Sequence, residues 1–222
     1  MCDLVFALNI FMKHTIETRY LWATPLFKTD ISSSLVHSTL SEVQRLRDRA
    51  TVEDPSGNWC SPDDLHTREA FAPMVSAAET FAAECLDQLT VVRDSVYISC
   101  MWANTAPVGV AHAIHGHSNS MYSGVVYLSA PPGSAGTVFV DPRPAAAVLV
   151  PQYASASPEV IGTNLVSPAQ AGVMLLWPSW LQHGVHSTGS AAEHTRVSLS
   201  FNCMIRGRLG EATTHLDTRG CN

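Results

Sequence analysis

The sequence predicts a mainly β protein, a sandwich or barrel with helices packed on one outer face. After about residue 90 the spacing of apolar residues changes from the period of a helix to the two-residue period of a strand. Many short apolar runs follow, separated by Gly, Pro and Ser turns. At 222 residues and 46% apolar content, the chain can form one sizeable core. We expect a single domain over 1–222, with mostly helical support over 1–90, a strand core over 91–206 and a tail over 207–222.

Two helices are expected in the support. Ser32 to Ser34 offer an N-cap, and apolar residues then recur at helical spacing as far as Leu46. A second helix fits 69–89, where an apolar stripe begins at Phe71. Strands are expected around 96–102 and near 109–117, 122–129, 136–140, 145–150, 159–163, 172–177, 182–187 and 194–205. The Ala/Ser/Pro-rich stretch 144–170 predicts a flexible excursion that serves as a lid over one end of the barrel.

Charge and composition exclude several kinds of partner. A net charge of −6 leaves nothing to neutralise phosphates, so we expect neither nucleic acid nor an anionic membrane as partner. No apolar run reaches the roughly 18–20 residues of a membrane-spanning helix. The start, MCDLVFALNIFMK, carries an acid where a signal peptide has basic residues, and the six cysteines form no C-x-x-C pair. We therefore expect a soluble, cytoplasmic protein with reduced thiols that acts on a small molecule.

Histidine is the anomaly in the composition: there are ten, and three fall between residues 112 and 117. Side chains two apart on a strand share a face, so His115 and His117 are expected to project together and His112 the other way. Two imidazoles on one face can grip a metal ion, although two surface histidines are the alternative interpretation. A turn centred near residue 190 predicts that His183 lies beside Arg196 or the residue after it.

The last predicted strand has one polar face and one apolar face. Arg196, Ser198, Ser200 and Asn202 alternate with Val197, Leu199, Phe201 and Cys203. The apolar row suits packing against helices, so the polar row is expected to line the barrel interior. A buried arginine needs an anion, because an unpaired buried charge is costly. No acidic residue lies on that face, which favours a ligand carboxylate; an ion pair with Asp141 is the alternative.

Four runs of residues, in this order along the chain, resemble a group of 2-oxoglutarate/Fe(II) oxygenases. They are HGHSNSMYSGVVYL (115–128), FVDPR (139–143), AGVMLLWPSWLQHGV (171–185) and RVSLSFN (196–202). Trp102, Asn104 and the early TPLF (24–27) also fit, so the resemblance covers most of the chain from about residue 24. It implies that the core over 91–206 is a double-stranded β-helix, a jelly-roll barrel flanked by helices. This agrees with the pattern of strands.

The resemblance also implies a site and its cofactors. It assigns Fe(II) to His115, His117 and His183, with 2-oxoglutarate as cosubstrate and O2 as oxidant. The residues that it implies for 2-oxoglutarate are Arg196, Ser198, Tyr127 and Asn104. The residues that it implies for the catalytic and substrate pocket are Trp102, Asp141, Arg143 and Asn202. Arginine suits the far carboxylate of 2-oxoglutarate, because its planar guanidinium donates two parallel hydrogen bonds.

One position departs from the wider superfamily, whose members mostly bind iron with two histidines and one carboxylate. His117 stands where that carboxylate is expected. Either three imidazoles bind the iron, or Asp141 supplies the carboxylate. The expected reaction is oxidation of a C–H bond in a small, amino-acid-like substrate. The sequence predicts neither the identity of that substrate nor the oligomeric state.

Other functions remain open at this stage. A cupin-type iron dioxygenase binds its metal through three histidines and needs no 2-oxoglutarate. Gly109, placed before His115, matches the opening of the cupin signature, but Met121 and Tyr122 stand where that signature has a glutamate. A non-catalytic jelly-roll binding module and a zinc hydrolase with a three-histidine site are the remaining alternatives. A requirement for 2-oxoglutarate would distinguish a 2-oxoglutarate/Fe(II) oxygenase from all of these alternatives.

Overall fold

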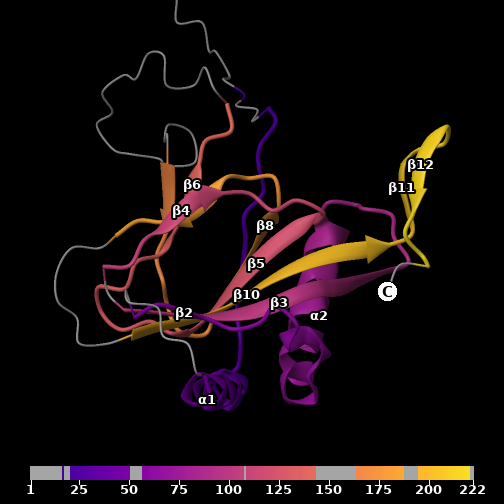
Figure 1. Ribbon diagram of the computed structural model, residues 1–222. Coiled ribbons are helices and arrows are strands. Elements are labelled where there is room, and N and C mark those ends of the chain that lie inside the picture. Colours follow the sequence, from indigo (N-terminus) through magenta and orange to yellow (C-terminus); the bar gives the residue numbers. More distant parts are fainter. Residues whose placement is uncertain are drawn as a thin grey trace, which may run out of the picture.

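Figure 1 shows a computed structural model in which antiparallel strands form two main sheets, with α1 and α2 against the larger one. The structure describes residues 17, 21–50, 57–107, 109–143, 164–187 and 195–220. The larger sheet contains, in spatial order, β1 (Phe27–Asp30), β8 (Val173–Pro178), β5 (Tyr122–Ser129), β10 (Thr195–Arg206), β3 (Ser95–Pro107) and β2 (Trp59–Cys60). The smaller sheet contains β4 (His112–His115), β9 (His183–Val185), β6 (Thr137–Val140) and β7 (Asn164–Ser167). A hairpin, β11 (Arg208–Glu211) and β12 (Thr214–Asp217), extends from the end of β10.

Both predicted helices are present. Helix α1 spans Ser33–Asp48, and the side chain of Ser32 caps it by accepting from the Leu35 amide at 3.4 Å. Helix α2 spans Ala72–Gln88 and follows two short 3-10 turns, η1 (Leu65–Thr67) and η2 (Glu69–Phe71). Within the described part of the chain, no helix has the length and apolar character that crossing a membrane requires.

The main core lies between the two helices and the outer face of the larger sheet. The apolar row of β10 faces this core, where Leu199, Phe201 and Cys203 are all at most 1% exposed. The strand opposite makes room for the largest of them, because Gly124 pairs with Phe201 and a Cβ at Gly124 would lie 2.3 Å from the phenyl ring. The alternation predicted for this strand is therefore confirmed, and so is a β fold with helices on one outer face.

A second apolar cluster lies between the two sheets. Its buried members are Val125, Tyr127, Phe139, Val173, Leu175, Trp177 and Leu181. These come from the inner faces of β5, β6 and β8 and from the turn before β9. The cluster closes one side of the space between the sheets and leaves the polar face of β10 to line the rest. Two antiparallel sheets facing each other in this way form the jelly-roll, or double-stranded β-helix, that the sequence predicted.

Two sequence predictions about connections are wrong. Strand β9 does not pair with β10: it pairs with β4 and β6 in the smaller sheet, whereas β10 pairs with β3 and β5 in the larger one. The chain passes from one sheet to the other between them, which a count of residues around a turn cannot reveal. Strand β7 lies within the stretch that was expected to be an irregular excursion. Its sequence, NLVS, is only four residues long, which is too short for alternation to indicate a strand. The predicted strands at 145–150 and 159–163, most of the predicted lid and the turn near residue 190 lie outside the described residues.

Candidate active site

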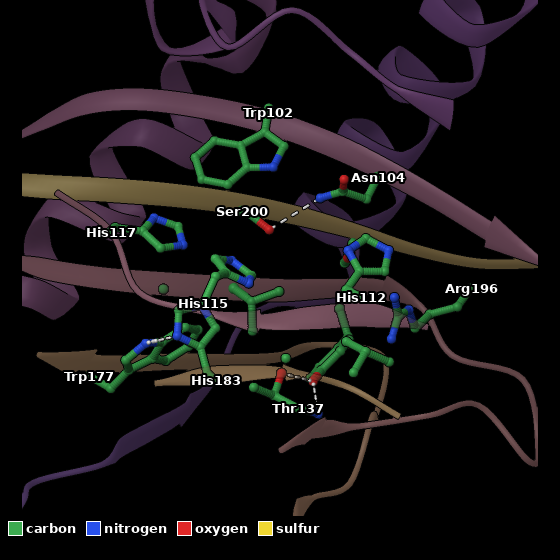
Figure 2. Close-up of a pocket in the computed structure, with 16 residues that line it drawn as sticks. Trp102, Asn104, His112, His115, His117, Thr137, Trp177, His183, Arg196 and Ser200 are labelled. Carbon is green, nitrogen blue, oxygen red and sulfur yellow. Dashed lines mark hydrogen bonds between the residues drawn. The ribbon is translucent and has the colours of Figure 1, made fainter. Parts of the chain in front are cut away.

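A cavity opens between the two sheets and contains about 560 Å³ of empty space, counted out to its mouth. It is lined by Trp102, Asn104, His112, His115, His117, Gly124, Val125, Tyr127, Thr137, Trp177, His183, Gly184, Val185, Arg196, Ser198 and Ser200. Figure 2 shows the side chains of Arg196 and His112 at one end of this cavity and three histidines at the other. None of these described lining residues is acidic, so the cavity favours an anionic ligand.

The three histidines at one end are those predicted to hold a metal ion. One ring nitrogen from each of His115, His117 and His183 lies within 4.8 Å of the others. Strand pairing places two of them together, because His115 on β4 is opposite His183 on β9. His117 follows two residues later, and its amide donates to the Ser179 carbonyl at 2.9 Å. A Cβ at Gly116 would lie 2.9 Å from the end of the Gln182 side chain, which can move, and 3.3 Å from the Ser179 carbonyl oxygen, so space beside this residue is limited.

The hydrogen bonds of the three rings leave the same nitrogen free in each. Nδ1 of His115 lies 2.8 Å from the Ala113 carbonyl oxygen, and Nδ1 of His183 lies 2.9 Å from the Leu181 carbonyl oxygen. A carbonyl can only accept, so each Nδ1 carries the proton and each Nε2 keeps its lone pair. Nε1 of Trp177 also lies 3.3 Å from Nδ1 of His183, but a protonated Nδ1 cannot accept from it.

The third ring is held in the same tautomer by a side chain of the larger sheet. Nδ1 of His117 donates to Oδ1 of Asn202 at 2.7 Å. Oδ1 of Asn202 also accepts from Ser123 at 2.8 Å, and the Ser123 hydroxyl lies 2.8 Å from that of Ser179. Asn202 does not line the cavity, so its contribution is to orient His117 from behind, as outer partners of metal-bound histidines commonly do.

Burial favours the neutral form of two of these imidazoles, His183 and His117. It lowers the pKa of His183 to about 4, with smaller opposing contributions from its hydrogen bond to Leu181. Burial also lowers the pKa of His117, although its bond to Asn202 acts in the other direction. A neutral imidazole can donate a lone pair to a metal, whereas an imidazolium cannot. Three imidazole nitrogen donors suit a divalent transition metal such as Fe(II), and His115, the exposed member, leaves the cluster accessible from solvent.

The other end of the cavity contains a buried arginine. Arg196 is 6% exposed and donates from Nη1 to the Ala135 carbonyl at 2.8 Å, while its buried Nε has no hydrogen-bond partner. Burial lowers the pKa of this guanidinium, but a group with so high an ordinary pKa stays charged. The neighbouring Tyr127 hydroxyl is occupied, since it lies 2.7 Å from the Thr137 hydroxyl and accepts from the Thr137 amide at 3.0 Å.

Most of the remaining predicted residues also reach the cavity. Ser198, Tyr127, Asn104 and Trp102 all line it. The Trp102 ring stacks on that of His117 at 5.7 Å between centroids, and Asn104 donates to the Ser200 hydroxyl at 3.3 Å. Of the polar row predicted on the last strand, Arg196, Ser198 and Ser200 therefore face the cavity. Asn202 does not line it, so its expected place in the substrate pocket is not what the structure shows.

Asp141 and Arg143 do not reach it. The Asp141 carboxylate accepts from Nε of Arg143 at 2.9 Å and from its Nη2 at 2.6 Å, and this pair lowers the pKa of Asp141. Neither residue lines the cavity, and Asp141 is not part of the histidine cluster. The placement of these two residues in the substrate pocket is thus wrong. Asp141 also neither pairs with Arg196 nor joins the histidines, the two other roles considered for it. Its carboxylate is neutralised by the residue two positions away.

The prediction that His112 points away from the other histidines is also wrong. His112 pairs with Val185 and His115 pairs with His183, so three steps along β4 oppose two steps along β9. The extra residue is a β-bulge, which turns the strand enough for His112 to line the same cavity. Thr137 and Trp177 also line the cavity, and the sequence analysis did not predict either of them. Alternation along β6 and β8 could have placed both on an inner face, but no chemistry singled them out.

The jelly-roll thus places a three-histidine cluster and a buried arginine in one cavity. Residues 100–202 match the model of a family described as "Putative 2OG-Fe(II) oxygenase". This confirms the resemblance predicted from the sequence, and with it the class of enzyme, over the part of the chain that forms the cavity. No match was found among curated proteins.

Solved structures with the same fold include a hydroxylase and an α-ketoglutarate-dependent epimerase. A prolyl-4-hydroxylase from Pseudomonas putida is 16% identical with a TM-score of 0.58, covering 83% of this chain and 94% of its own. The α-ketoglutarate-dependent epimerase SnoN from nogalamycin biosynthesis is 16% identical with a TM-score of 0.61, covering 83% and 79%. HygX from Streptomyces hygroscopicus, crystallised with nickel, 2-oxoglutarate and hygromycin B, is 17% identical with a TM-score of 0.55, covering 82% and 83%. At these identities the likeness establishes the fold.

Proposed function

We propose that this protein is an Fe(II)- and 2-oxoglutarate-dependent oxygenase that uses O2 to oxidise a C–H bond of a small, amino-acid-like substrate. One observation carries the proposal: a single cavity holds a cluster of three histidines at one end and, among the described residues, a buried arginine without a carboxylate partner at the other. A metal ion and a dicarboxylate would satisfy both ends at once. The family match over residues 100–202 supports the same chemistry.

His115, His117 and His183 would hold the iron through Nε2, because their Nδ1 atoms are engaged elsewhere. Bound iron and 2-oxoglutarate supply the oxidising chemistry: O2 is consumed, 2-oxoglutarate becomes succinate and CO2, and a substrate C–H bond is oxidised. The protein's contribution is to fix the three donors on one side of the ion. Ligands from the cavity would complete the coordination of the ion.

Arg196 would bind the far carboxylate of 2-oxoglutarate. Its guanidinium is charged, buried and directed into a cavity without acidic lining residues, so a carboxylate there would gain a strong, charge-assisted hydrogen bond. The Ser198 hydroxyl, on the same face of β10, offers a second donor. Tyr127 would bound this end of the cavity through its ring, since Thr137 already occupies its hydroxyl.

Trp102 and Asn104 are the proposed substrate-side residues, because both line the cavity on β3 and Trp102 stacks on His117. We further propose a cytoplasmic protein, which agrees with the four free cysteines among the described residues.

The proposal can be tested by adding Fe(II) to the metal-free protein without oxygen, first alone and then with 2-oxoglutarate. We expect a weak visible charge-transfer band only when both are present, and succinate formation once O2 is admitted. Arg196→Lys keeps the charge but loses the planar fork, so it should weaken 2-oxoglutarate binding by about 10- to 150-fold. The affinity for Fe(II) should hardly change, which makes Fe(II) binding the internal control.

Three results would overturn the proposal. If the protein oxidises a thiol or a diketone with no need for 2-oxoglutarate, it is a cupin-type dioxygenase. Hydrolysis supported by zinc, with no consumption of O2, would indicate a zinc hydrolase. If the wild-type protein binds neither Fe(II) nor 2-oxoglutarate, it is a jelly-roll binding module without this chemistry.

A further inference from the structure

Two buried hydrogen-bonding nitrogens in the cavity have no partner, and they come from different sheets. One is Nε of Arg196 on β10, in the larger sheet, and the other is Nε2 of His112 on β4, in the smaller sheet. Both side chains line the cavity, and Figure 2 shows them next to each other, at the end opposite the three-histidine cluster. A buried polar atom without a partner costs free energy, so two such atoms side by side point to a ligand that both would contact.

The position of His112 depends on an irregularity in the backbone. The bulge between His112 and His115 adds one residue to β4 relative to β9, and this brings His112 onto the cavity side. Bulges next to functional sites often redirect a side chain in this way. The same ring also lines a shallow outer groove with Asn58, Ala111 and Ala113, so it forms part of the wall between the cavity and the outside. A ligand bound in the cavity would therefore have His112 between it and the outer groove.

The charges around His112 define the kind of group that it can recognise. Burial lowers the pKa of His112, and the nearby positive charge of Arg196 lowers it further, with a smaller contribution from His115. The ring is therefore neutral and offers a single N–H. Two adjacent donors, one of them a cation, would be satisfied by two oxygens of one anionic group. A carboxylate meets this requirement, and none of the described lining residues supplies one.

We propose that His112 donates from Nε2 to the far carboxylate of the 2-oxo acid cosubstrate, completing with Arg196 a clamp built from both sheets. This proposal rests on the function proposed above and names a determinant of its cosubstrate selectivity. Arg196 supplies the charge, and His112 supplies a directed donor from the facing sheet. The clamp would favour a 2-oxo acid that ends in a carboxylate over one of the same length that ends in a methyl group.

The test compares two 2-oxo acids on the anaerobic Fe(II)-loaded protein: 2-oxoglutarate, and 2-oxopentanoate, which lacks the far carboxylate. His112→Phe keeps a flat ring but removes the donor, so it should weaken 2-oxoglutarate binding by about 10-fold. Binding of 2-oxopentanoate should not weaken. His112→Gln retains an N–H donor and should recover part of the lost affinity. His215→Phe, at an exposed histidine of the β11–β12 hairpin, is the matched control and should change neither affinity.

Each other outcome overturns a different statement. If wild-type protein binds Fe(II) but not 2-oxoglutarate, the proposed function fails. If wild-type protein binds 2-oxoglutarate and His112→Phe binds it equally well, the function stands and the role of His112 is wrong. If His112→Phe loses both acids or the metal to the same extent, His112 shapes the site without contacting the carboxylate. Thermal melts of the His112 variants verify folding, and His112→Leu, which also removes the donor, serves for the comparison if His112→Phe does not fold.

Discussion

The two sheets of this protein contribute to its cavity in different ways. The larger sheet has long, regular strands, and β10 alone runs over 12 residues with one face in the helix-covered core and the other in the cavity. The smaller sheet has strands of three or four residues, one of them interrupted by a bulge. The large sheet provides the arginine and its neighbouring hydroxyls, whereas the small sheet provides two of the three histidines and His112.

This difference separates stability from chemistry. A side chain on the outer face of β10 can affect the cavity only through the fold, because the sheet lies between them. The histidines, in contrast, sit on short elements whose orientation is fixed by a few hydrogen bonds, one of which comes from Asn202 in the larger sheet. Substitutions in the two regions should therefore have effects that can be measured independently.

The largest effect is expected in the core of the larger sheet. Phe201→Ala would remove a fully buried ring at the centre of that core and leave a cavity, at a cost of about 3–5 kcal/mol in the free energy of unfolding. Val166→Ala, on β7 of the smaller sheet, removes a side chain that is 54% exposed and should cost less than about 0.5 kcal/mol. Urea unfolding of both variants makes the measurement. Equal losses would show that the two sheets contribute alike to stability.

An intermediate effect is expected where the sheets meet behind the metal cluster. Asn202→Leu removes the acceptor that fixes the tautomer of His117, so divalent-metal affinity should fall by about 10- to 100-fold. The control is Ser200→Ala, on the same face of the same strand, since Ser200 has its hydrogen bond with Asn104 instead. Isothermal titration of the metal-free proteins would compare them. Similar losses in both variants would mean that the polar face acts as a whole, without a specific role for Asn202.

The smallest effect is expected at the end of β6. Asp141→Asn breaks an ion pair with the exposed Arg143, and we expect no measurable change in metal affinity or in the midpoint of unfolding. The same titration can measure this. A loss of metal affinity of about 10-fold or more would show that Asp141 reaches the iron as a ligand, and that the three-histidine assignment is wrong.

The reliability of sequence reasoning follows the same division between the sheets. On β10, strict alternation over a long strand was enough to place Arg196 and Ser198 inside and Leu199 and Phe201 outside. On β4 the same rule failed for His112, because one extra residue at the bulge changes which side chains share a face. Nothing in the letters HAIHGH indicates where that residue is inserted. In a regular strand, alternation along the sequence predicts which side chains share a face. In a bulged strand, that prediction also requires knowledge of how the strand pairs with its neighbour.

Long-range connections were beyond the sequence for a different reason. The prediction that His183 pairs beside Arg196 assumed that neighbouring strands form a hairpin, but in a jelly-roll the chain changes sheets between them. Both residues nevertheless face the same cavity, from opposite sides. The error at Asp141 was local: its side chain accepts from the Arg143 amide at 2.9 Å, a short-range turn in which the carboxylate is already satisfied. The D-P-R spacing allows that turn.

The aromatic neighbours of the histidine cluster give the protein a built-in optical reporter. Two of its five tryptophans lie against proposed metal ligands, Trp102 at 5.7 Å from His117 and Trp177 at 4.8 Å from His183, measured between ring centroids. An open-shell ion held by those imidazoles would quench the emission of both indoles, whereas a closed-shell ion such as zinc would leave most of it intact. Occupancy of the centre, and the electronic character of whatever fills it, can thus be followed by intrinsic fluorescence without any label.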